Sequence, residues 1–130
     1  MASAIHHAES AVRKWGGCVS DYLPISEWFD SSKFHLADFR HRAMHHHSAG
    51  IEMCEQIFGP KVFLHNEDGS PVMNGSVVSA AKPHWIPTKW VAERHVVEDM
   101  GRIPSAVEWL VNIQAQPWMS QEARRLSEER

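Results

Sequence analysis

Histidine is the residue type with the greatest capacity for chemistry in this chain, because ten of its 130 residues are histidines. Several of them crowd between His35 and His47. Another, His95, stands four residues before Asp99, so the two would share one face of a helix and could hold one ion. A buried imidazole needs a hydrogen bond, an ion pair or a metal, because an unpaired buried polar group costs about 1–3 kcal/mol. The spacing therefore predicts a metal site built from histidine and aspartate.

We expect this site to lie between two helices, one carrying the crowded histidines and the other carrying His95. Three consecutive histidines on one helix cannot all face one ion, so His46 or His47 is expected to point inward. The predicted ligands are His35, His46, His47, His95 and Asp99. Imidazole and carboxylate ligands suit Zn²⁺, which we favour, and also Fe²⁺ or Mn²⁺. The chain has no HExxH string, so the alternative stays open that these histidines are structural.

The other histidines are not among the predicted ligands. His41 and His45 stand four residues apart, but on the polar face of the expected helix, where solvation would satisfy them equally well. No shared function is expected for the remaining ones, which are His6, His7, His65 and His84.

Three arginines could line an anionic pocket near the histidines: Arg40, Arg42 and Arg94. Arginine makes paired hydrogen bonds to phosphate, and a bound metal lowers the pKa of water, so the combination would suit hydrolysis of a phosphoester. The ligand would then be a small phosphorylated molecule, although no catalytic residue is predicted. The arginines could equally pair with nearby carboxylates such as Asp38, Glu93 and Glu98. The rival functions are a non-catalytic interaction protein, with a host protein as partner, and a pH-responsive module, because histidine titrates near neutral pH.

Other familiar chemistries lack their motifs in this sequence. No GxSxG elbow, Walker string or Rossmann glycine string is present. The two cysteines, Cys18 and Cys54, do not form a CxxC pair, which excludes a thiolate zinc knuckle. Both are expected to be reduced thiols, and the start of the chain lacks the apolar region of a signal peptide. We therefore expect a cytoplasmic protein.

The composition is that of a globular domain, with 43% apolar and 22% charged residues. The net charge of −3 argues against an extensive nucleic-acid surface. No apolar run approaches the roughly 20 residues of a membrane helix, so no membrane association is expected. Residues 1–118 are predicted to form a single α-rich domain and residues 119–130 a polar tail. A homo-oligomer is left open.

The predicted fold is mainly α, with four to five helices packed as a small irregular bundle and one short β-hairpin. Apolar periodicity predicts a long helix over 38–58 and another over 88–100, with shorter helices over 2–15, 26–33 and 105–113. An apolar elbow is expected at 22–25. The apolar runs 61–64 and 72–73 flank an Asp-Gly pair, which is typical of a hairpin turn. The stretch 74–87 is the least regular.

Two strings give the chain a resemblance to a known family. The first, RHRAMHHHSAGI, spans residues 40–51, and the second, HVVEDMGRIP, spans residues 95–104. With the earlier strings KWGG (14–17) and DYLP (21–24), they resemble a small uncharacterised family of bacteria and their phages, a domain of unknown function. The resemblance covers residues 5 to 118. It implies a single domain and draws attention to the same histidines, but it implies no reaction.

Overall fold

Five α-helices and a two-stranded antiparallel sheet make up the computed structural model, which describes residues 3–72 and 83–120. This architecture confirms the mainly α fold. The helices are α1 (Ala4–Trp15), α2 (Val19–Asp30), α3 (Ser48–Phe58), α4 (Thr88–Met100) and α5 (Ala106–Leu110). The strands are β1 (Lys61–Phe63) and β2 (Trp85–Pro87), and the 3-10 turns are η1 (Ser31–Phe34), η2 (Phe39–Ala43) and η3 (Pro117–Met119).

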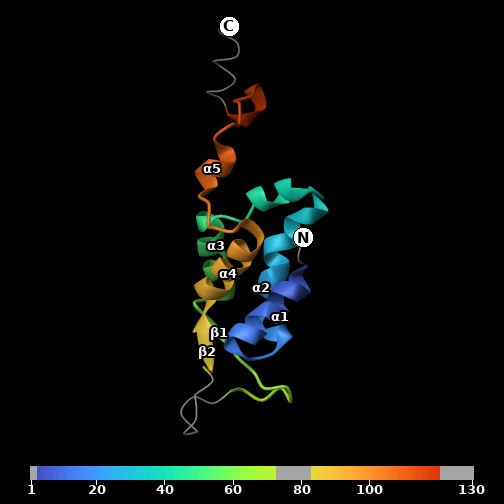
Figure 1. Cartoon of the computed structure of the whole chain (residues 1–130). Helices are drawn as coiled ribbons and strands as arrows, with labels where there is room; N and C mark the ends of the chain where they lie inside the picture. Colours follow the sequence, from blue (N-terminus) through green and yellow to red (C-terminus); the bar gives the residue numbers. More distant parts are fainter. Residues whose placement is uncertain (1–2, 73–82, 121–130) are drawn as a thin grey trace.

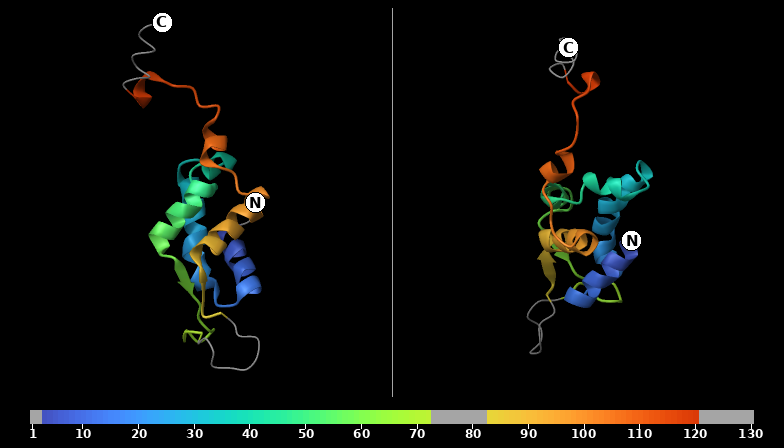
Figure 2. Two further views of the ribbon diagram at one scale, coloured as in Figure 1. Left: turned by 90° about the vertical axis from the view of Figure 1, so that its left-hand side faces the viewer. Right: turned by 45° about the horizontal axis from the view of Figure 1, so that its top comes forward.

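Helix α4 is the central element of the bundle. It packs against α1, α2 and α3, while α1 and α2 also pack on each other (Figures 1 and 2). The core between these helices contains Tyr22 and Phe29 from α2, Leu64 after β1, and Val96 from α4. Within the described ranges, none of the helices is long and apolar enough to cross a membrane.

Helix α2 is longer than the sequence predicts, and the predicted elbow at 22–25 is wrong. The helix begins at Val19, where the Asp21 carboxylate accepts a hydrogen bond from the Cys18 amide, and it continues through Pro24. Proline removes one helical hydrogen bond, but the buried face on either side of it, including Tyr22 and Phe29, holds the helix together. The consequence is that α2 ends at Asp30 and presents this carboxylate to the centre of the bundle.

The single long helix predicted over 38–58 is also wrong. The segment forms η2, then a turn, and then α3, whose N-cap is His47 in extended conformation. Gly50 makes this break compact, because a Cβ at Gly50 would lie only 1.9 Å from the carbonyl oxygen of His45. The turn therefore folds back tightly on the start of α3. It directs His46 to the centre of the bundle and His47 to the N-terminus of α3.

The predicted hairpin has the wrong second strand. Strand β1 pairs with β2 and not with the segment at 72–73, and Val62 lies opposite Ile86 with both side chains buried. Around the Asp-Gly turn, the described residues form an isolated bridge between His65 and Pro71, and the Val72 amide donates to the Leu64 carbonyl over 3.0 Å. Pairing with β2 places the buried side chains of Val62 and Ile86 on the core, whereas Val72 packs against the core only partly buried. It also sets the start of α4, since the Thr88 amide donates to the Pro60 carbonyl.

After α4 the C-terminal segment places α5 against α3 and η2, and η3 then lies farther from the bundle (Figures 1 and 2). Two hydrogen bonds tie its first part to the turn before α3. The Ser48 amide donates to the Pro104 carbonyl over 2.9 Å, and the Trp109 indole donates to the His46 carbonyl over 3.1 Å. The predicted polar tail lies outside the described residues from residue 121 onward.

Candidate metal centre

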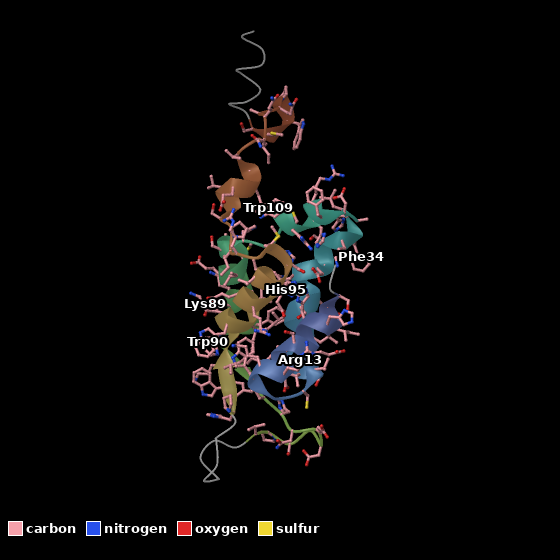
Figure 3. The ribbon with its side chains drawn as sticks, viewed as in Figure 1. Arg13, Phe34, Lys89, Trp90, His95 and Trp109 are labelled. Carbon is pink, nitrogen blue, oxygen red and sulfur yellow. The ribbon has the colours of Figure 1, made fainter. Side chains whose placement is uncertain are left out.

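Four side chains from three parts of the chain meet in the middle of the bundle. They are Asp30 at the end of α2, His46 in the turn before α3, and His95 and Asp99 on α4. One potential ligand atom from each residue lies within 4.8 Å of all the others. The exposed fraction of these side chains ranges from 0% to 9%. Figure 3 shows His95 in the middle of the bundle, whereas Phe34 and Trp90 lie at its edges.

The distances within this cluster fit the coordination shell of a small cation. His46 Nε2 lies 2.9 Å from Asp99 Oδ2, and His95 Nε2 lies 3.4 Å from the same oxygen. Both nitrogens lie 3.6 Å from Asp30 Oδ1. A tetrahedral ion with bonds of about 2.0–2.1 Å separates its ligand atoms by about 3.3–3.4 Å. These four separations lie within about 0.5 Å of the tetrahedral value, and all four ligand atoms lie within 4.8 Å of one another.

Several buried atoms of the cluster lack hydrogen-bond partners among the described residues. They include both ring nitrogens of His95, Nδ1 of His46 and Oδ2 of Asp30. Leaving a buried polar atom unpaired costs about 1–3 kcal/mol, so several in one place need an explanation. A cation between the carboxylates would give His95 Nε2 a partner and would balance two buried negative charges.

The charge state of the cluster is the one that binds a cation. Burial by itself would raise the pKa of Asp99, but its hydrogen bonds with His46, His7 and His95 hold that pKa far below the usual range. Asp30 follows the same pattern: burial opposes ionisation, and the contact with His95 outweighs it and lowers the pKa. Burial lowers the pKa of His46. Both carboxylates are therefore ionised at neutral pH. His46 Nε2 donates to Asp99 Oδ2 in this structure, so binding of an ion there would require the neutral ring to carry its proton on Nδ1.

His7 of α1 supports the cluster from outside. Its Nε2 lies 3.1 Å from Asp99 Oδ1, and its Nδ1 lies 3.0 Å from a carboxylate oxygen of Glu98. Burial would lower the pKa of His7, but the hydrogen bonds to Asp99 and Glu98 raise it overall. The ring also lies against that of His95, with 3.9 Å between centroids. His7 thus fixes Asp99 with the oxygen Oδ2 turned toward His46 and His95, as outer partners of metal ligands do.

The structure brings together three of the five predicted ligands, which are His46, His95 and Asp99. His35 is exposed after η1 and lies outside the cluster. His47 is buried but engaged as the N-cap of α3: its Nδ1 accepts from the Gly50 amide, and its Nε2 lies 3.1 Å from the Ala43 carbonyl. The break between η2 and α3 decides which of the two adjacent histidines faces the cluster, and a continuous helix over 38–58 does not predict it.

Sequence reasoning missed Asp30 and His7. Asp30 stands four residues after Ser26, a buried residue of α2, so correct bounds for that helix would have placed it on the inner face. His7 likewise belongs to the buried face of α1, next to Ala8 and Ala11. The signal was present in both cases, but it depended on knowing which face of each helix is covered.

The three arginines of the predicted anion pocket do not line one pocket among the described residues, because each contacts a different partner. Arg40 is exposed and pairs with Asp38. Arg42 alone approaches the cluster, with its guanidinium 3.7 Å from Asp99 Oδ1. Arg94 donates to the Ser10 hydroxyl over 2.8 Å and lies 3.9 Å from Glu98.

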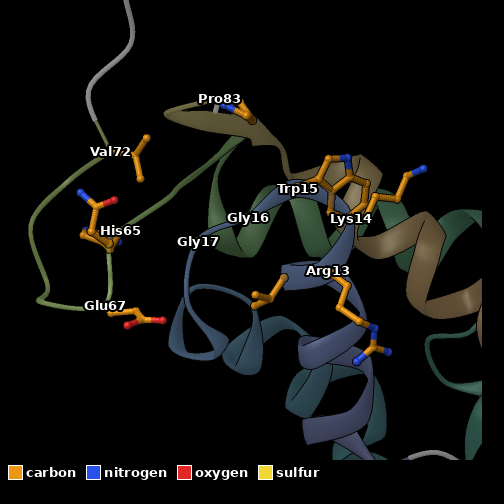
Figure 4. Close-up of a pocket in the computed structure, with 11 residues that line it drawn as sticks. Arg13, Lys14, Trp15, Gly16, Gly17, His65, Glu67, Val72 and Pro83 are labelled. Atoms are coloured by element: carbon orange, nitrogen blue, oxygen red, sulfur yellow. The ribbon is translucent and has the colours of Figure 1, made fainter. Parts of the chain in front are cut away.

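Two cavities lie away from the cluster. One, of about 620 Å³, separates the end of α1 at Trp15–Gly17 from His65, Glu67 and Val72 (Figure 4). The other, of about 540 Å³, lies beside Trp15 and Trp90 and reaches Glu98. Neither is lined by any of the four cluster residues.

Comparison with known proteins identifies a family but no activity. No curated protein and no solved structure matches the chain. One family model does match, over residues 2–119, and it confirms the resemblance to an uncharacterised domain family. The chain belongs to this family, the domain of unknown function DUF6915.

Proposed function

We propose that this protein binds one divalent transition metal through Asp30, His46, His95 and Asp99, and that the ion stabilises the fold. The observation that supports the proposal best is the convergence of two buried carboxylates and two buried imidazoles on one point. The candidate ions are Zn²⁺, Fe²⁺ and Mn²⁺, all of which accept such ligands.

The surroundings of the cluster favour a structural ion over a catalytic one. A catalytic metal keeps a position open for water or substrate, whereas a structural metal is enclosed by protein ligands. Here the ligands are almost fully buried, and the two cavities described above are lined by other residues. An ion in this place would join α2, α4 and the turn before α3, which are far apart in the sequence.

Hydrolysis of a phosphoester is not part of this proposal. That reaction requires a charged substrate to reach the metal, and only Arg42 of the three arginines approaches the cluster, where it faces Asp99. The predicted phosphorylated ligand and the predicted host protein partner stay predictions.

Metal analysis of the untagged protein tests the proposal. The protein is purified without chelators, incubated separately with Zn²⁺, Fe²⁺ and Mn²⁺, freed of unbound ion and analysed for metal. We expect about one equivalent of at least one of these ions, and removal by a chelator should lower the thermal unfolding temperature. The exposed variant His35→Ala serves as the matched control and should retain the ion. Less than about a tenth of an equivalent under every condition would contradict the proposal.

A further inference from the structure

His41 is a buried histidine near the cluster with only one of its ring nitrogens satisfied. It lies in η2, and its exposed fraction is 0%. Nδ1 lies 2.7 Å from the backbone oxygen of Asp38. A carbonyl oxygen can only accept, so Nδ1 carries the proton of this hydrogen bond. In the neutral ring, Nε2 therefore has a free lone pair.

That lone pair faces the cluster. His41 Nε2 lies 3.6 Å from Asp30 Oδ1 and has no hydrogen-bond partner among the described residues. The same oxygen lies 3.6 Å from Nε2 of His46 and 3.6 Å from Nε2 of His95. Three imidazole nitrogens thus surround one carboxylate oxygen at equal distances.

A proton alone explains this arrangement poorly. A separation of 3.6 Å is longer than a hydrogen bond from an imidazolium to a carboxylate, which is typically about 2.7–2.9 Å. The other carboxylate oxygen of Asp30, Oδ2, accepts no hydrogen bond but lies 3.8 Å from the Lys33 ammonium. That ammonium is a partner of Oδ2, so it does not explain the three nitrogens around Oδ1. Two electron-rich atoms facing each other in a buried site are stabilised when a cation lies between or beside them.

We propose that His41 Nε2 is a fifth ligand of the ion that Asp30, His46, His95 and Asp99 hold. This inference rests on the proposed function and extends it to a shell of three nitrogens and two oxygens. His41 is not among the four residues whose ligand atoms all lie within 4.8 Å of one another, so its Nε2 would have to move toward the ion on binding. The bond from Nδ1 to the Asp38 carbonyl is the outer contact that typically orients a metal-bound imidazole. Structural zinc sites are almost always four-coordinate, so a fifth ligand shifts the preference from Zn²⁺ toward Fe²⁺, Mn²⁺ or Co²⁺.

Cobalt provides the probe, because its visible absorption reports the number of ligands and is several-fold stronger for four ligands than for five. The full chain is titrated with Co²⁺ as the wild type, as His41→Ala and as the control His35→Ala. We expect wild type and control to show the weak absorption of five-coordinate Co²⁺. His41→Ala should bind Co²⁺ about 10- to 100-fold more weakly, with an altered spectrum, and added imidazole should restore the wild-type spectrum.

X-ray absorption of the Co²⁺-loaded wild type gives a readout that does not depend on how any variant folds. Scattering from three imidazoles per ion would support the proposal, and scattering from two would overturn it. An unchanged spectrum and affinity in His41→Ala would also overturn it while leaving the four-residue site intact. Two bound ions per chain would show that His41 belongs to a separate site. A wild type that binds no ion would instead contradict the proposed function itself.

Discussion

Within residues 3–72 and 83–120, one group of histidine and aspartate lies near the surface and another lies in the centre of the bundle, and their surroundings differ sharply. Near the start of α2, His65 Nδ1 lies 2.6 Å from Asp21 Oδ1, and Asp21 Oδ2 accepts from the backbone amides of Cys18 and His65. The His65 side chain is 42% exposed, so water reaches it. In the central cluster, the side chains of His46 and His95 are buried and keep ring nitrogens without partners.

The comparison shows that residue type alone does not define a metal site. In the surface pair, two backbone amides and the His65 ring satisfy the Asp21 carboxylate, solvent reaches the His65 ring, and Asp21 acts as part of a helix cap. In the central cluster, no backbone amide of the described residues reaches Asp30 or Asp99 with a hydrogen bond in the structure, and the imidazoles converge instead. Unmet buried polar atoms, and not the number of histidines, mark the place where an ion would be bound.

Replacing the aspartate in each group should give the largest difference between the two groups, both in metal binding and in the free energy of unfolding. Asp99→Asn removes the charge that His46, His7 and Arg42 share, so we expect loss of metal binding. We also expect a fall of about 3–5 kcal/mol in the free energy of unfolding, as when one partner of a buried ion pair is removed. Asp21→Asn should cost about 1 kcal/mol through the helix cap and leave metal binding unchanged. Urea unfolding with and without added metal measures both; equal losses in the two variants would remove the distinction.

Neighbouring histidines offer a finer test within one turn. His46→Ala should abolish binding of the ion, because it removes a ligand. His47→Ala should leave about one equivalent bound and cost about 1–2 kcal/mol of stability, because it removes the N-cap of α3 and the contact of Nε2 with the Ala43 carbonyl but no ligand. Metal analysis and thermal unfolding of the two variants check this. Retention of the ion by His46→Ala would show that the ligands are misassigned.

The smallest change in metal binding is expected from the outer partner of Asp99. His7→Ala should weaken binding about 10- to 100-fold without changing the number of ions bound, because His7 orients a ligand but does not supply one. His65→Ala, which disrupts the surface pair, is the matched control and should not change the affinity. Competition with a chromophoric chelator measures both affinities. An identical affinity for wild type and His7→Ala would show that His7 serves stability alone.

Sequence reasoning found the parts of this site that depend on local spacing. His95 and Asp99 lie four residues apart on a helix that the apolar pattern predicts well, so their shared face could be inferred. The inward direction of His46, as opposed to His47, depends on the close approach of the Gly50 and His45 backbones, which a helical pattern does not encode. Asp30 was missed because Pro24 suggested an interrupted segment where α2 is continuous.

The fold shows the same division between local and long-range information. Capping residues and apolar periodicity predicted the bounds of α1 and α4 closely, although Thr88 does not cap α4 and the Trp90 side chain is exposed. The partner of β1 was predicted wrongly, because an Asp-Gly turn is a local signal and the pairing of Val62 with Ile86 depends on what the core covers. Long-range packing thus decided both the strand pairing and the membership of the cluster.

Anomalous diffraction from crystals of the metal-loaded protein, recorded at the absorption edge of the ion, tests the central claim most directly. The account predicts one strong peak among Asp30, His46, His95 and Asp99, about 2.0–2.2 Å from their ligand atoms. A map with no peak there, or with its strongest peak at His65 and Asp21, would contradict the account.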